Sequence, residues 1–176
     1  MKGQEIEARN NYGLQENSAV PQFLTFRIGS ELFGIELEQT REILEYTGVT
    51  EVPLMPKFLS GVINLRGEMV PVIDLAVRLG RKAIQVQRRT CIIVIEIEAQ
   101  NQNHVLGLLA DAVSEVVEIP THEIEKAPSF GANIRAEFIQ GIAKRENKFV
   151  VLLDAANALS MRELSYLVEA ELKESH

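Results

Sequence analysis

The chain has 176 residues, of which 46% are hydrophobic, and a formal net charge of −7. This length is enough for one bilobed domain or two small ones with a real core, and the acidic balance disfavours nucleic acid and anionic membranes as partners. A single cysteine excludes an internal disulfide framework and fits a reducing cytosol, and no run of about 18 apolar residues is available for membrane insertion.

Residues 1–20 are polar and predict a disordered N-terminal tail. After them, alternating apolar residues predict a strand over Phe23–Ile28 and a returning strand over Leu32–Leu37. The segment Glu38–Glu45 is expected to form one to two turns of helix, because its apolar residues would share one face. Thr47–Leu54 is expected to be extended and to lie at a sheet edge or a bend.

The sequence predicts a compact unit of strand, turn, strand and short helix over Val62–Leu79. A strand over Val62–Leu65 reaches Arg66-Gly67, where glycine tolerates the positive φ that hairpin turns need. The chain returns as a strand over Met69–Ile73, and Asp74 can then cap a short helix over Leu75–Leu79.

The next segments predict a linker followed by more β-structure. Residues 81–89 carry four basic side chains and are interpreted as an exposed connector. Thr90–Glu98 is a strongly β-forming strand, whereas Val105–Ile119 is long and strand-like at both ends, with Asp111-Ala112 as the point where it could break. Residues 120–133 are expected to form a loop-rich segment.

The strand–turn–strand–helix unit occurs twice. Adding 80 to each residue number converts Phe58–Gly61 into the similar Phe138–Gly141. Blocks that begin at Gly34 and Gly107 agree at a smaller offset. The second unit is followed by a helix that is expected to start at a capping box on Ser160. Two copies of a β-rich unit are the direct inference.

The two copies differ at their exposed polar positions. Asn64 and Arg66 in the first copy correspond to Lys144 and Glu146 in the second. A solvated guanidinium is the simplest explanation of Arg66, but Asn64 and Arg66 would project from one face beside apolar surface. This arrangement makes them a candidate polar hot spot for binding.

The sequence lacks the patterns of common catalytic and metal sites. Asp74 and Asp154 occupy matching positions and could be paired acid–base carboxylates, but helix caps explain both more simply. Cys91 begins an apolar strand and fits a core thiol better than a nucleophile. The histidines are too far apart in sequence to indicate a metal site; they are His104, His122 and His176. No catalytic residue, metal ligand or cofactor is therefore predicted.

Several motifs point to one family. The longest are Gly61-Val-Ile-Asn-Leu-Arg-Gly67 and Val70-Pro-Val-Ile-Asp-Leu75, and shorter ones are Phe23-Leu-Thr-Phe26, Arg41-Glu-Ile-Leu44 and Ala127-Pro-Ser-Phe130. With these motifs the chain resembles the CheW family of bacterial chemotaxis coupling proteins over about residues 20–160.

The resemblance implies a mainly β fold. Two pseudo-repeated, five-stranded, SH3-like β-barrels would pack side by side, with short helices and a C-terminal helix. The CheW-like domain would cover residues 21–160, with a first half at about 21–85 and a second half at about 90–160. Residues 161–176 would form the C-terminal helix and tail. How the strands are shared between the barrels stays open, because a strand from one half could complete the other.

The resemblance also implies a function without catalysis. Family members bridge chemoreceptors to the histidine kinase CheA in signalling arrays at the inner face of the membrane, in the cytoplasm, without inserting into it. The receptor's coiled-coil hairpin tip would dock in a groove lined by the first short helix and the Asn-Leu-Arg-Gly hairpin. The residues carried over to this groove are Thr40, Glu42, Ile43, Gly61, Asn64 and Arg66. Pro128 and Phe130 are carried over to the contact with the kinase regulatory domain and the array.

Two other functions stay open at this point. A small enzyme or ligand-binding barrel would need a deep polar pocket that contains titratable groups with perturbed pKa values. A nucleic-acid-binding protein would need a basic stripe on one face, and the charges of residues 81–89 are spread thinly. The residues by themselves favour a binding or scaffolding protein over an enzyme.

Overall fold

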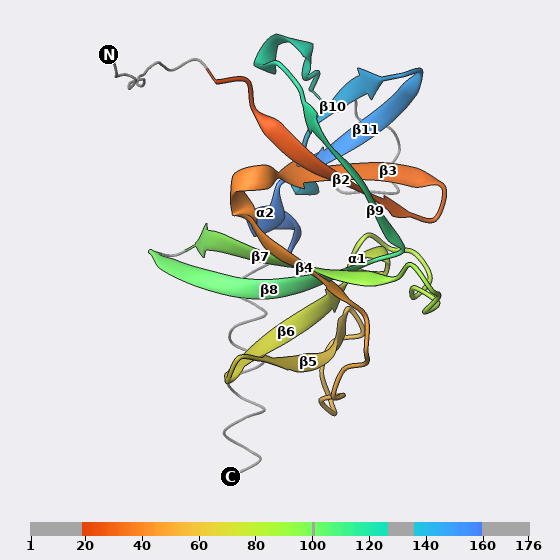
Figure 1. Cartoon of the computed structure of the whole chain (residues 1–176), viewed down its shortest axis with the longest axis vertical. Helices are drawn as coiled ribbons and strands as arrows, with labels where there is room; N and C mark the ends of the chain where they lie inside the picture. Colours follow the sequence, from red (N-terminus) through yellow and green to blue (C-terminus); the bar gives the residue numbers. More distant parts are fainter. Residues whose placement is uncertain (1–18, 100, 127–135, 160–176) are drawn as a thin grey trace, which may run out of the picture.

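The computed structural model describes residues 19–99, 101–126 and 136–159, and these form two five-stranded β-sheets (Figure 1). Sheet 1 lies in the upper part of Figure 1 and has the order β10 (Ile139–Arg145), β11 (Lys148–Leu153), β3 (Glu31–Glu36), β2 (Gln22–Ile28) and β9 (Ala112–Glu118). Sheet 2 lies below it and has the order β4 (Thr40–Glu45), β7 (Cys91–Ala99), β8 (Gln102–Ala110), β6 (Glu68–Asp74) and β5 (Leu59–Leu65). The prediction of a mainly β fold built from two five-stranded units is confirmed.

Short helical turns connect the strands. They are the 3₁₀ turns η1 (Leu37–Gln39), η2 (Thr121–Glu123) and η3 (Ala136–Phe138), and the α-helices α1 (Leu75–Arg78) and α2 (Ala155–Ala158). As the sequence predicts, Asp74 caps α1, because its carboxylate accepts a hydrogen bond from the Val77 N–H at 3.3 Å. Asp154 caps α2 in the same way through the Asn157 N–H at 3.2 Å. In the described part of the chain, no helix is long and apolar enough to cross a bilayer.

Each sheet takes strands from both halves of the chain. Sheet 1 combines β2 and β3 with the later β9, β10 and β11, whereas sheet 2 combines β7 and β8 with the earlier β4, β5 and β6. Strands of different halves meet in two parallel pairings, β11 with β3 and β6 with β8, and in two antiparallel pairings, β2 with β9 and β4 with β7. Strand sharing, which the sequence leaves open, is therefore reciprocal between the halves.

The central strand β7 is buried on both faces over most of its length. On β7, Ile93 and Ile95 contribute to a core that includes residues of both sheets, whereas Ile92 and Val94 point into a separate cluster within sheet 2. An equivalent cluster within sheet 1 contains Phe23. Two-sided burial explains why β7 is an almost continuous apolar run instead of an alternating one.

The prediction of a helix over Glu38–Glu45 is wrong. Only η1 is helical there, and the chain continues as the edge strand β4, which pairs antiparallel with β7. Ladder hydrogen bonds with β7 outweigh a weak local helix pattern in a segment that contains the β-branched Thr40 and Ile43. In contrast, the predicted break within Val105–Ile119 is confirmed, because Asp111 separates β8 from β9.

Some predictions concern residues outside the described part of the chain. These are most of the N-terminal tail, the C-terminal helix that begins at Ser160, and the array-contact residues Pro128 and Phe130. They stay predictions from the sequence.

Candidate functional site

The β5–β6 hairpin is closed by a two-residue turn at Arg66 and Gly67. Both residues have positive φ, +52° and +87°, and Leu65 pairs with Glu68 on either side of them. This is the backbone of a tight primed turn, which matches the twist of the flanking strands. The Gly67 N–H donates to the Asn64 side-chain oxygen at 2.9 Å. Asn64 therefore stabilises the turn that presents Arg66.

Arg66 connects this turn to the opposite edge of sheet 2. Its guanidinium donates to the Glu42 carboxylate on β4 and forms an ion pair with it. Because β4 and β5 are the two edge strands of the sheet, this contact brings the two edges together. The Arg66 side chain is 68% exposed and the Glu42 side chain 30%. The hydrogen bond from Arg66 lowers the pKa of Glu42 below its ordinary value.

The three predicted site residues on β4 do not share one face. The strand has an irregular register between Thr40 and Glu42, so that Thr40 pairs with Ile95 but Glu42 pairs with Val94. Side chains of directly paired residues lie on the same side of a sheet. Thr40 therefore lies on the side of the core between the sheets, whereas Glu42 lies on the opposite side.

Ile43 follows Glu42 and returns to the side of Thr40. It pairs with Ile93, yet it is 46% exposed because β4 is an edge strand. The structure thus brings Glu42 and Arg66 into contact, with Asn64 in the same turn as Arg66. The side chains of Thr40 and Ile43 lie on the opposite face of β4 from Glu42.

Gly61 occupies a buried position that constrains the backbone. It sits at a register shift of β5, where a Cβ would lie 2.5 Å from the Thr50 carbonyl oxygen. The segment that contains Thr50 pairs there with Val62 through an isolated bridge, with N–O distances of 2.8 and 2.9 Å. The observed contacts of Gly61 are therefore with the protein itself, and its contact with a receptor stays a prediction.

One residue of this surface was missed in the sequence. Met69 on β6 pairs with Asn64 and is 45% exposed, which places an apolar side chain next to the turn. The equivalent residue of the second copy, Phe149, is 67% exposed. Applying the repeat offset to apolar residues as well as polar ones would have indicated that both hairpins expose a large apolar side chain at this position.

Among the described residues, the second copy has no equivalent of the Glu42–Arg66 ion pair. The corresponding residues are Glu115 on β9 and Glu146 in the β10–β11 turn. Within the described residues neither carboxylate has an ion-pair partner. Both line a cavity of about 600 Å³ whose wall also includes Arg27 and Phe149. The two copies thus present different charges at equivalent places.

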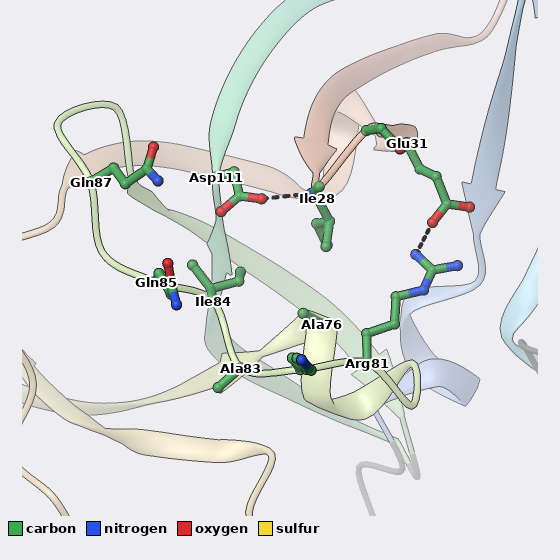
Figure 2. A pocket seen from close by; sticks show the side chains of 12 residues that line it. Ile28, Glu31, Ala76, Arg81, Ala83, Ile84, Gln85, Gln87 and Asp111 are labelled. Carbon is green, nitrogen blue, oxygen red and sulfur yellow. Dashed lines mark hydrogen bonds and ion pairs between the residues drawn. The ribbon is translucent and has the colours of Figure 1, made fainter.

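A second cavity, of about 580 Å³, lies between the β2–β3 turn and the connector that follows α1 (Figure 2). Arg81 of the connector points toward Glu31 and forms an ion pair with it, although its buried Nη1 atom lacks hydrogen-bond geometry. Asp111 accepts a hydrogen bond from the Gly29 N–H at 2.6 Å. These charged groups neutralise each other or hold the loops together, which favours a structural role over substrate binding.

Metal coordination has no support in the described ranges, which contain no group of three or more histidine, cysteine, aspartate or glutamate side chains placed to hold an ion. The Cys91 thiol is buried, and this burial raises its pKa and disfavours the reactive thiolate. The chemistry of this surface is therefore that of contact between proteins: an ion pair, a rigid turn and exposed apolar side chains.

Comparison with known proteins gives one consistent result. The family model for the CheW-like domain matches residues 22–163. The chemotaxis protein CheW of Klebsiella aerogenes is 32% identical over 144 residues, which cover 82% of this chain and 84% of that protein. A probable chemotaxis protein CheW of Rhizobium etli is 36% identical over 138 residues, which cover 78% and 86%. The crystal structure of the scaffolding protein TtCheW from Thermoanaerobacter tengcongensis is similar with a TM-score of 0.72 at 30% identity, and the match covers 82% of this chain and 90% of that one.

Proposed function

This chain belongs to the CheW-like domain family, and we propose from this premise that it is a non-catalytic adaptor that couples chemoreceptors to the histidine kinase CheA. The match spans every strand of both sheets, and a similar solved protein is described as a scaffold. The adaptor would act in the cytoplasm, at the inner face of the membrane, within receptor arrays that it helps to assemble. Fold membership does not identify the pathway, so the proposal extends to chemotaxis-type arrays in general.

The Glu42–Arg66 ion pair is the observation that carries the proposal. It places a charged pair of defined geometry at the surface, on a turn that Asn64 holds rigid. Ile43 on β4 and Met69 on β6 are exposed and supply apolar surface. A partner helix can be recognised by an apolar stripe together with charges that set its register. The cytoplasmic hairpin tip of a receptor offers such a helical surface.

The six predicted receptor-binding residues divide into two roles under this proposal. Arg66, Glu42 and Ile43 are exposed or partly exposed and would touch the receptor. Asn64 and Gly61 would act indirectly, because their observed contacts hold the turn and the β5 backbone. Thr40 is half-buried beside η1 and donates a long hydrogen bond of 3.5 Å to the Glu36 carbonyl, so it would contribute at the margin of the surface.

The kinase and array contact is proposed at Pro128 and Phe130. This proposal depends on the Ala127-Pro-Ser-Phe130 motif alone, because these residues lie outside the described part of the chain. Aromatic residues are enriched at protein interfaces and often act as anchors there.

Charge reversal at Arg66 tests the receptor surface. The variant Arg66→Glu should lose co-sedimentation with receptor-containing membranes, because it places two carboxylates where the ion pair stood. Its circular dichroism and melting curve should stay close to those of the unchanged protein, since both side chains are solvated. The matched control is Glu146→Arg, which reverses a charge in the same type of turn on sheet 1 and should leave receptor binding intact. Undiminished binding by Arg66→Glu would refute this surface.

A charge swap separates the ion pair from direct contact. The double variant Glu42→Arg with Arg66→Glu restores an ion pair of reversed polarity. If the pair acts only by holding the sheet edges together, the double variant should recover receptor binding. If Arg66 and Glu42 touch receptor charges, as proposed, the double variant should bind no better than Arg66→Glu.

The second surface is tested with Phe130→Ala. This truncation should weaken kinase-dependent array assembly more than receptor co-sedimentation, because the two contacts are proposed on different surfaces. Equal loss of both would contradict that separation.

A further inference from the structure

An arginine of α1 lies between two phenylalanine rings. The Arg78 Cζ atom is 4.7 Å from the ring centroid of Phe58 and 5.0 Å from that of Phe138. The Arg78 Nε–H also donates to the Ala158 carbonyl oxygen of α2 at 2.7 Å. Both rings are buried, and Arg78 itself is partly buried. Cation–π contacts and hydrogen bonds from a charged donor both depend on geometry. Arg78 therefore makes directional contacts with its neighbours, which are otherwise largely apolar.

The partners of Arg78 belong to both sheets. Phe58 directly precedes β5 of sheet 2, and its carbonyl accepts the Asp74 N–H at 2.7 Å. Phe138 ends η3 and directly precedes β10 of sheet 1, and its carbonyl accepts the Asp154 N–H at 2.9 Å. Figure 1 shows α2 between the two sheets. Arg78, which follows β6 of sheet 2, therefore reaches across to the helix and the ring that belong to sheet 1.

The repeat explains why one arginine serves both copies. The offset of 80 converts Phe58 into Phe138 and Arg78 into Ala158. The two rings are thus equivalent positions of the two copies, and the space between them holds one guanidinium. A second arginine at position 158 would bring two cations together, whereas alanine leaves room for the Arg78 guanidinium to reach the backbone carbonyl of this residue. That carbonyl is at the C-terminal end of α2, where helix carbonyls lack an intrahelical donor.

We propose that Arg78 is an orientation lock, which fixes how sheet 2 sits against sheet 1 and contributes little to the folding of either sheet. The other buried side chains of the core between the sheets make aliphatic and aromatic contacts, which are not directional and tolerate small sliding motions. The Arg81–Glu31 ion pair is a second polar contact across the sheets, but it lies at the edge of this core beside the cavity described above. The two ring faces and the Ala158 carbonyl define one position for the guanidinium, so they resist sliding.

Distances between the sheets test the lock. Spin labels would be attached to cysteines placed at the exposed residues Gln102 of sheet 2 and Lys148 of sheet 1, in a Cys91→Ala background, and the distance distribution measured by pulsed electron resonance. Arg78→Met keeps a long apolar side chain but removes the cation and the donor. It should widen the distribution at least twofold, while amide exchange within β7 and β11 stays as slow as in the unchanged protein.

The matched control is Arg145→Met. Like Arg78, Arg145 donates to a backbone carbonyl, that of Glu118, at 2.8 Å. It also forms an ion pair with Glu123 at 2.7 Å. These contacts all lie on the sheet 1 side of the molecule, so this variant should leave the distance distribution unchanged. An unchanged distribution in Arg78→Met would overturn the proposal. Faster exchange throughout both sheets together with the widening would also overturn it, because Arg78 would then be a general stabilising residue.

Two milder variants decide the matter if Arg78→Met does not fold. Arg78→Lys keeps the charge but loses the planar group and the Nε donor, and Phe138→Leu keeps an apolar side chain but loses one ring. Each should fold and widen the distribution by a smaller factor than twofold. Distributions equal to that of the unchanged protein in both variants would overturn the lock.

Discussion

The two hairpins β5–β6 and β10–β11 have the same backbone but different side chains. In each turn two successive residues have positive φ, Arg66 and Gly67 in the first and Glu146 and Asn147 in the second. In each hairpin the first strand has an irregular register at a buried glycine. The exposed turn residue, however, is a cation in one copy and an anion in the other. Backbone geometry limits what can change at buried and turn positions, whereas exposed side chains change at little cost to the fold.

The hairpins are also tied to their sheets in different ways. In the first copy the tie is the exposed pair of Arg66 with Glu42 across the two sheet edges. In the second copy Arg145, which is one residue before the turn, pairs with Glu123 and donates to the Glu118 carbonyl. The first tie consists of two side chains that a partner can reach, whereas the second also uses the main chain. This difference supports the proposal that the receptor binds the first copy.

The largest expected effect concerns the glycines of the two register shifts. In Gly61→Ala the new Cβ would meet the Thr50 carbonyl oxygen at 2.5 Å, and the backbone has to shift. We expect the free energy of unfolding to fall by about 2–3 kcal/mol. In Gly141→Ala the nearest atom is the Ile124 Cγ2 methyl at 2.4 Å, and the nearest backbone atom, the Glu125 carbonyl oxygen, is farther away at 2.9 Å, so we expect about 1–2 kcal/mol.

Urea denaturation of both glycine variants measures this difference. An equal loss of unfolding free energy in the two variants, or a larger loss for Gly141→Ala, would contradict the interpretation that the backbone packs more closely against Gly61 than against Gly141.

The two helix caps should differ by a smaller amount. The Asp74 carboxylate is buried and accepts from the Val77 N–H at 3.3 Å and from the Ile84 N–H at 3.0 Å, so it also holds the connector. In the part of the chain that the structure describes, the carboxylate of the half-exposed Asp154 accepts hydrogen bonds from Asn157 alone. We expect Asp74→Ala to cost about 2 kcal/mol and Asp154→Ala about 1 kcal/mol. Thermal or urea unfolding checks this order, and the reverse order would show that the connector does not depend on Asp74.

Removal of the Asn64 side chain, which stabilises the β5–β6 turn, should have the next largest effect on stability. Asn64→Ala removes the acceptor of the Gly67 N–H and should cost about 0.5–1 kcal/mol in a urea titration. Lys144→Ala, at the equivalent and exposed position of the second copy, should change the unfolding free energy by less than about 0.5 kcal/mol. If Lys144→Ala lowered the unfolding free energy as much as Asn64→Ala, the stabilising role of Asn64 would not be specific to the first turn.

The smallest effect is a change of titration. Arg66 lowers the pKa of Glu42, so the contribution of the pair to stability is present above the ordinary glutamate pKa and is lost as the pH falls through the lowered pKa of the folded state. In Arg66→Gln the Glu42 carboxyl, followed by NMR, should titrate at a higher pH than in the unchanged protein. Glu146→Gln should leave that titration unchanged. A Glu42 midpoint that does not move in Arg66→Gln would mean that the pair is not formed in solution.

Much of the fold could be predicted from local sequence signals. The hairpin turn at Arg66-Gly67, the caps at Asp74 and Asp154 and the break at Asp111 all depend on backbone preferences of a few adjacent residues. The edge strand β4 is the exception, because the local apolar spacing favours a helix whereas its pairing partner β7 is remote in sequence, with Thr40 paired to Ile95. No local pattern reports such a partner.

The sequence by itself determined most of the strands, where they turn and that the unit occurs twice, because dihedral preferences and apolar periodicity act within a few residues. Only the tertiary structure decided that the halves exchange strands, that Arg66 reaches Glu42 and that Arg78 is held between equivalent rings. It also decided that Thr40 and Ile43 lie on the opposite face of β4 from Glu42, because a register shift of one residue moves the side chains that follow to the other face of the strand.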